Sequence, residues 1–149
     1  MNNFELERSL KGYPVTVCAA EQLEIRRGRF VISNTDRLGG PGKHWVTFYF
    51  PHTGPDEFFD SLGKWPEDYN VNFEKALRRR YWINRSHIQD SDSDECGLYC
   101  IYYVMERCAG KRIKDIVEPF DVKKRKQNDK FIVSYLNRHS YFMRCNKRI

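Results

Sequence analysis

A nearly unbroken apolar run from Cys96 to Cys108 is the feature that most constrains how this chain of 149 residues can fold. Almost every residue between these two cysteines is aliphatic or aromatic, and charged residues enter only in the last turn. The run is longer than a typical strand, and Gly110 follows it as a stop signal. We therefore expect a buried central helix over 96–108, with Ser93 or Asp94 as its N-cap.

Segments typical of strands lie ahead of this helix. The range 44–50 has the sequence His-Trp-Val-Thr-Phe-Tyr-Phe, and 57–60 has the sequence Glu-Phe-Phe-Asp, with proline and glycine between them. These two ranges predict a hairpin. A further strand is predicted at 30–33, before a glycine-rich turn over 34–42.

The second half of the chain predicts mainly helices. Apolar spacing indicates a helix over 72–81 and an amphipathic helix over 128–139, with a short helix at 113–117. Residues 82–89 favour a short strand, and 90–94 form a polar connector. Strands at the front and helices at the back, without alternation, indicate an α+β fold.

Length and composition narrow the class of protein. Residues 1–149 suit one domain with a real core, and 40% hydrophobic with 31% charged residues is typical of a soluble globular protein. No apolar run reaches the ~18 residues that a membrane span needs. The first residues lack the layout of a signal peptide. We expect an intracellular monomer without a membrane partner.

Cysteine usage argues against a metal site. The odd number of five cysteines cannot pair completely within the chain, and they lack the paired C-x-x-C spacing of zinc sites. We expect mostly free thiols and neither a metal nor a small-molecule cofactor. The five are Cys18, Cys96, Cys100, Cys108 and Cys145.

Positive charge is clustered along the chain, whose formal net charge is +6. Such clusters are typical of surfaces that bind DNA or another polyanion, and solvated faces are the alternative. The candidate residues are Arg78, Arg79 and Arg80, then Lys123, Lys124, Arg125 and Lys126, and a tail that includes Arg138, Arg144, Lys147 and Arg148.

Cys96 is a candidate nucleophile because it stands where the central helix is expected to begin. Unpaired backbone amides at a helix N-terminus favour negative charge, and the thiolate is the nucleophilic form of cysteine. A buried structural cysteine is the alternative.

His44 opens a strand after the glycine-rich turn, so its ring could serve as general base for the thiol. A histidine that only forms hydrogen bonds at a strand end is the alternative.

Asp60 and Gln89 could complete such a site. The predicted hairpin would bring Asp60 beside His44, where a carboxylate could fix the imidazole tautomer and stabilise its charged form. Gln89 lies seven residues before Cys96. Its amide could donate to a developing oxyanion together with the Cys96 backbone N–H. The alternatives are a turn-forming aspartate and an ordinary polar residue at a strand end.

Three motifs together resemble the adenain and SUMO-protease clan of cysteine proteases. They are Gly-x-His-Trp at 42–45, Phe-Phe-Asp-Ser-Leu-Gly at 58–63 and Gln-x6-Cys-Gly-x-Tyr-Cys at 89–100, in the clan's order of His, Asp and Cys. Two stretches, 30–45 and 135–142, resemble the adenain side, the maturation proteases of adenoviruses and of Maverick or Polinton-type DNA elements. The resemblance covers roughly residues 13 to 145.

The resemblance implies a role for each site residue. His44 would be the base, Asp60 the orienting acid, Cys96 the nucleophile and Gln89 the oxyanion donor. Trp45 would wall a narrow substrate channel that suits glycine next to the scissile bond, although plain core packing would also explain it. The implied fold is a papain-like α+β domain in which a small mixed sheet packs on a central helix starting at Cys96.

The chain also departs from the adenain pattern. Adenain is activated by DNA and by a short viral peptide that forms a disulfide with a cysteine between the acid and the glutamine, and residues 61–88 contain no cysteine. A peptide activator held without a disulfide, or no activator, remains open. DNA is retained as a candidate cofactor because of the basic clusters.

The expected function is that of a cysteine endopeptidase that processes viral or mobile-element capsid precursors at glycine-containing sites. It would act in the host cell, at the nucleus or assembly site, and in the virion. A peptidase that cuts ubiquitin-like modifiers after Gly-Gly is the first alternative. A nucleic-acid-binding module with a structural cysteine is the second.

Overall fold

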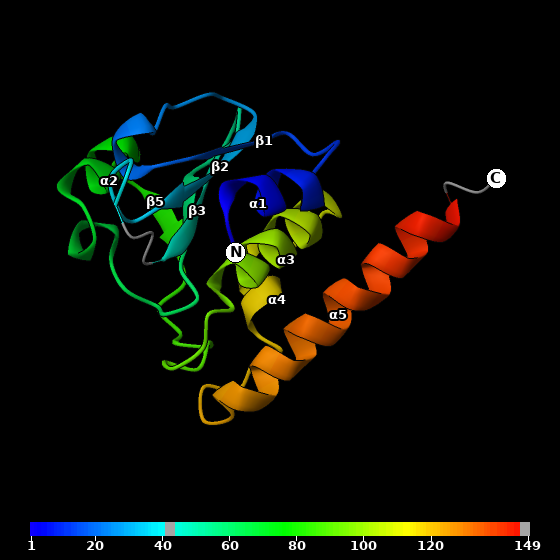
Figure 1. Ribbon diagram of the computed structural model, residues 1–149. Helices are drawn as coiled ribbons and strands as arrows, with labels where there is room; N and C mark the ends of the chain where they lie inside the picture. The colour runs from blue at the N-terminus through cyan, green and yellow to red at the C-terminus, as the bar shows by residue number, and fades with distance from the viewer. Residues whose placement is uncertain (41–43, 147–149) are drawn as a thin grey trace.

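A computed structural model describes residues 1–40 and 44–146, with side chains described up to residue 139. A five-stranded sheet lies at its centre, with helices on both sides (Figure 1). The strands are β1 (Val15–Cys18), β2 (Arg29–Asn34), β3 (Trp45–Phe50), β4 (Asp56–Phe59) and β5 (Tyr81–Ile83). The helices are α1 (Asn3–Ser9), α2 (Val71–Ala76), α3 (Cys96–Cys108), α4 (Ile113–Val117) and α5 (Arg125–Asn146), with short 3-10 turns η1 (Ala20–Gln22) and η2 (Pro66–Asp68).

The sheet is mixed, and its strands follow one another in sequence order from β1 to β5. The central pairs β2–β3 and β3–β4 are antiparallel, whereas the outer pairs β1–β2 and β4–β5 are parallel. The predicted hairpin is therefore present at the middle of the sheet. Its strands align Thr47 with Phe59 and Phe48 with Phe58.

Alternating side chains along the central strands fill a core on each face of the sheet. Trp45 and Phe59 pack with α3 on one face, whereas Val46, Phe48 and Phe58 pack with Phe73 of α2 on the other. This period of two is the geometric consequence of an extended backbone. Because both faces of the sheet are covered by a core, the central strands are almost continuously apolar in sequence.

Several predicted elements are confirmed. The helix over 96–108 has the predicted bounds and is buried along most of its length, and the helix over 113–117 is also present. Gly110 follows α3 with a φ of 97°, a backbone conformation that glycine adopts without strain. The α+β class and the mixed sheet packed on the central helix are confirmed as well.

The predicted helix over 72–81 is wrong in its second half. α2 ends at Ala76, and Leu77 is already extended. The reason is a buried carboxylate: the backbone N–H of Arg78 donates to Asp56 Oδ2 at 2.9 Å, and its guanidinium donates to Oδ1 at 2.8 Å. Because of these bonds, the helix ends before Arg78. Tyr81, the first residue of β5, then pairs with Asp56, the first residue of β4.

The remaining differences concern element ends and the N-terminal region. The strand predicted within 82–89 is only the three-residue β5, and α5 is longer than the predicted range 128–139. Glu95, rather than Ser93 or Asp94, occupies the N-cap of α3 and makes no side-chain capping bond. The backbone N–H of Ser93 closes a turn on the Asp90 carbonyl at 3.1 Å, which places Ser93 outside the helix.

Besides the short 3-10 turns η1 and η2, two elements, α1 and β1, were not predicted from the sequence. Both lie at the start of the chain, where the apolar pattern is short. Within the described part of the chain, no helix combines the length and the apolar character that crossing a lipid bilayer requires.

The Asp56 cluster gives a stability prediction. Asp56 is fully buried and also pairs with Arg27 at 2.6 Å. Asp56→Asn should lower the free energy of unfolding by about 2–3 kcal/mol, because it removes the charge that two arginines neutralise. Urea denaturation followed by circular dichroism measures this. Asp115→Asn, at an exposed ion pair with Arg112, is the control and should change it by less than about 0.5 kcal/mol; equal effects would contradict the prediction.

Candidate active site

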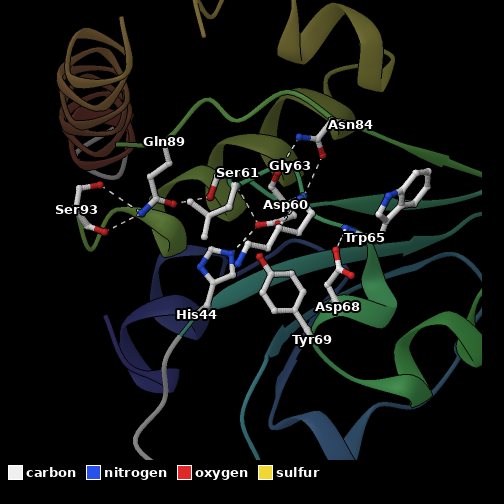
Figure 2. A network of polar contacts seen from close by, with 12 residues as sticks. His44, Asp60, Ser61, Gly63, Trp65, Asp68, Tyr69, Asn84, Gln89 and Ser93 are labelled. Atoms are coloured by element: carbon white, nitrogen blue, oxygen red, sulfur yellow. Dashed lines mark hydrogen bonds and ion pairs between the residues drawn. The ribbon is translucent and has the colours of Figure 1, made fainter. Parts of the chain in front are cut away.

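His44 and Asp60 meet at one end of the central hairpin. His44 directly precedes β3 and Asp60 directly follows β4, so the antiparallel pairing brings the two residues together. The imidazole Nε2 lies 2.6 Å from Asp60 Oδ1, and both side chains are buried. The contact expected from the hairpin is therefore present (Figure 2).

The carboxylate of Asp60 accepts hydrogen bonds on both oxygens. Oδ1 accepts from His44 and from the backbone N–H of Leu62 at 3.0 Å. Oδ2 accepts from the backbone N–H of Lys64 at 3.0 Å and from the Tyr69 hydroxyl at 2.6 Å. Burial alone would raise the pKa of this carboxyl, but His44 and the other donors outweigh burial and lower it. Asp60 is thus held as a carboxylate.

Neighbouring side chains hold the Asp60 unit in place. Asn84, just after β5, accepts from the Asp60 backbone N–H at 3.0 Å and donates to the Asp60 carbonyl at 2.7 Å. The Tyr69 ring packs against the His44 ring, with centroids 5.4 Å apart. Figure 2 shows Asn84 and Tyr69 approaching Asp60 from different segments of the chain.

Cys96 is the first residue of α3, and its side chain reaches the start of β3. Burial raises the pKa of the thiol, but a hydrogen bond and the charge of His44 lower it, helped by the backbone N–H groups of Trp45 and Gly97. The net pKa is below the ordinary value. Because Asp60 occupies Nε2 of His44, Nδ1 is the ring nitrogen left to face the thiol.

The imidazole is held between two groups that favour its charged form. Burial lowers the pKa of His44, but Asp60 and Cys96 together raise it to about 9. A lowered thiol pKa beside a raised imidazole pKa favours a thiolate–imidazolium pair near neutral pH. The arrangement can therefore supply both a nucleophile and a proton donor.

Gln89 is buried beside Ser61, the residue that follows Asp60. Its Oε1 accepts from the Ser61 hydroxyl at 2.5 Å, and its Nε2 donates to the Ser93 carbonyl at 2.9 Å. The backbone N–H of Gln89 donates to the Ser61 carbonyl at 3.1 Å. Gln89 and Asp60 therefore belong to one network, linked through Ser61 (Figure 2). A role as oxyanion donor stays a prediction.

Trp45 lies in the same core cluster as Cys96 and is only 6% exposed. Its indole N–H donates to the Met1 carbonyl at 3.1 Å. The core packing considered for Trp45 is therefore present. Its role as the wall of a substrate channel stays a prediction.

The other cysteines differ from Cys96. Cys18 and Cys100 are buried free thiols, and burial raises the pKa of each. Cys108 is an exposed free thiol whose pKa is also raised. Among the four cysteines whose side chains are described, Cys96 alone has a lowered pKa; Cys145 lies outside these residues.

The basic clusters have mixed environments. Arg78 is bound to Asp56, and Arg125 donates to the His87 carbonyl at 3.1 Å. Arg138 donates to the Ser134 carbonyl at 3.4 Å. The remaining described members, Arg79, Arg80, Lys123, Lys124 and Lys126, are exposed. The side chains of Arg144, Lys147 and Arg148 lie outside the described residues, and DNA binding stays a prediction for the whole set.

Sequence reasoning missed three residues of this network. Ser61 could have been noticed because it directly follows the predicted acid, whereas Tyr69 and Asn84 carry no local signal. Both reach Asp60 only through the path of the chain between β4 and α3. Their contacts depend on tertiary structure.

Comparison with known proteins gives a distant relative. No protein-family model matches the chain. It is 32% identical over 97 residues to a protein of Acanthamoeba polyphaga mimivirus that carries the name "Putative thiol protease". The match covers 58% of this chain and 32% of that protein, so the chain spans about a third of the length of this relative. The similarity is therefore confined to part of each protein.

The pairing of His44 with Cys96 predicts the reactivity of the thiol. Iodoacetamide should alkylate Cys96 well below the pH at which an ordinary thiol of pKa about 8.5 reacts. His44→Ala should move this onset to higher pH and slow alkylation at pH 7 by about tenfold, since an unassisted thiol is only a few per cent ionised there.

Mass spectrometry of the labelled peptides measures each thiol separately. Cys108 is the internal control, because its pKa is raised and it lies outside the network. Equal pH profiles for Cys96 and Cys108, or a profile of Cys96 unaffected by His44→Ala, would contradict the assignment.

Proposed function

We propose that the chain is a cysteine endopeptidase with the papain-like fold of the adenain and SUMO-protease type. Cys96 is the nucleophile, His44 the base, Asp60 the orienting acid and Gln89 the oxyanion donor. The buried His44, bonded to Asp60 at 2.6 Å and paired with the thiol at the start of α3, is the observation that carries the proposal. The similarity to a viral protein named as a thiol protease adds support.

The reaction follows from the charges of these groups. The Cys96 thiolate attacks the peptide carbonyl carbon, and the carbonyl electron pair moves to oxygen. The Gln89 amide and the Cys96 backbone N–H donate to this oxyanion. As the C–N bond breaks, the imidazolium of His44 gives its proton to the leaving amine, which leaves an acyl-thioester on Cys96.

Hydrolysis of the thioester completes the cycle. His44, now neutral, takes a proton from water, whose oxygen attacks the thioester carbonyl. Collapse of the second tetrahedral intermediate releases the carboxylic acid and restores the thiolate–imidazolium pair. Asp60 remains ionised throughout and stabilises the charged imidazole.

The proposed substrates are viral or mobile-element capsid precursors cleaved at glycine-containing sites. Trp45, next to the nucleophile in the core cluster, would limit the width of the channel and so favour glycine. We further propose that residues 1–149 form one monomeric protease domain that acts in the host cell and virion. DNA and a noncovalently held peptide are proposed activators, with the exposed basic residues as the DNA contact.

A peptide library tests the proposed reaction. Cleavage at glycine-containing sites should be lost by at least about 10³-fold in Cys96→Ala, because no other group can form the acyl intermediate. Cys108→Ala, which removes an exposed thiol, is the matched control and should retain activity. Cleavage that persists in Cys96→Ala would overturn the proposal.

The same assay separates the alternatives. Addition of duplex DNA should raise the rate if DNA is an activator, and an unchanged rate would contradict that part. Cleavage of a Gly-Gly-linked modifier conjugate with no cleavage of capsid-type peptides would favour a ubiquitin-like-modifier peptidase. DNA binding without any hydrolysis would favour a nucleic-acid-binding module.

The pH profile of hydrolysis tests the role of Asp60. Activity should fall on the alkaline side near pH 9, where the His44 imidazolium loses the proton that the leaving amine needs. Asp60→Asn removes the charge that raises the pKa of His44, so this fall should move to lower pH. Asp115→Asn, at an exposed position of α4, should leave the alkaline limb where it is. An unchanged alkaline limb in Asp60→Asn would argue against the assignment.

A further inference from the structure

The side chain of Gln89 is fixed between two serines that the proposed mechanism does not use. Ser61 and Gln89 are 1% and 2% exposed, so most of each side chain is shielded from bulk water. The Ser61 hydroxyl lies 2.5 Å from Gln89 Oε1, and the Ser93 carbonyl lies 2.9 Å from Gln89 Nε2. An amide group held at both ends in this way has a single orientation.

The two contacts agree on which end of the amide is the donor. The Ser93 carbonyl can only accept, so it requires the NH₂ end of Gln89 on its side. The carbonyl end of Gln89 then faces Ser61, whose hydroxyl must donate. A flipped amide would place two carbonyl oxygens against each other. Nε2 also contacts the Ser93 hydroxyl at 3.3 Å, so both contacts of the NH₂ end are with Ser93.

We propose that Ser61 is a positioning residue for catalysis, which donates to Gln89 Oε1 and thereby fixes the orientation of the amide that serves as the proposed oxyanion donor. The inference rests on the proposed protease function. Ser61 also anchors the segment itself, since its carbonyl accepts from the backbone N–H groups of Ile88 and Gln89 at 2.9 and 3.1 Å.

Two effects of the Ser61 hydroxyl follow. It removes the alternative amide orientation, so no rotation is needed when the oxyanion forms. It also polarises the amide, because a hydrogen bond accepted at the carbonyl oxygen strengthens the donor character of the N–H groups. Since Asp60 holds His44 and the next residue holds Gln89, one dipeptide after β4 would set both the base and the oxyanion donor.

Ser61→Ala tests this role in the hydrolysis of a glycine-containing peptide. The variant should lower kcat by about tenfold while KM changes less than about twofold, because the lost contact acts in the transition state. The rate of Cys96 alkylation by iodoacetamide, which forms no oxyanion, should stay unchanged. Ser33→Ala is the matched control: Ser33 is equally buried and donates to the Asn34 carbonyl at 2.9 Å.

A double-mutant cycle with Gln89→Ala distinguishes positioning from general support. If Ser61 acts through Gln89, Ser61→Ala should cause no additional loss of kcat in the Gln89→Ala background. Ser61→Cys, which keeps the size of the side chain but donates weakly, is the second variant and should show the same loss in hydrolysis if Ser61→Ala fails to fold.

The outcomes separate the two hypotheses. Absence of any Cys96-dependent hydrolysis in the unmodified chain would overturn the proposed function. Hydrolysis that is normal in Ser61→Ala or Ser61→Cys would overturn only the role of Ser61. A loss that is equal in both Gln89 backgrounds, or a parallel loss of alkylation, would assign Ser61 to general structure and overturn it as well.

Discussion

The buried carboxylate of Asp60 is the group on which the arrangement of the site depends. A charge in this position is tolerated only because four donors reach it, and each donor comes from a different residue: His44, Leu62, Lys64 and Tyr69. Satisfying one charge therefore fixes the ring that faces Cys96, the loop after β4 and the tyrosine that covers the histidine. The same four hydrogen bonds therefore stabilise the buried charge of Asp60 and set the geometry of the site.

The central hairpin and α3 supply the frame for this charge. Antiparallel pairing of β3 and β4 brings the residue before one strand next to the residue after the other. The apolar face of α3 packs on these strands and sets its first residue, Cys96, against the start of β3. A thiol that is buried would ordinarily be less acidic, yet His44 and the backbone amides of Trp45 and Gly97 reverse that effect. Among the described thiols, burial dominates at Cys18 and Cys100, which lack such a partner.

Most of the fold follows from patterns that act locally. The strands around β3 and β4 and the helix over 96–108 were predictable because long apolar runs and turn residues determine them within a few positions. α2 was predicted too long because its end depends on Asp56, 22 residues away from Arg78 in sequence. The N-cap of α3 was assigned to the wrong residue because Ser93 is instead engaged by the turn to Asp90 and by Gln89.

The sequence by itself determined the candidate residues His44, Asp60, Gln89 and Cys96, since their types and order suit thiol-based catalysis and resemble the pattern of a protease clan. Only the tertiary structure decided how they are held. The contacts of Tyr69 and Asn84 with Asp60, and of Ser61 with Gln89, join segments that no local periodicity connects. The physical reason is that a buried polar group must find its partners wherever the folded chain brings them, and sequence spacing does not encode that encounter.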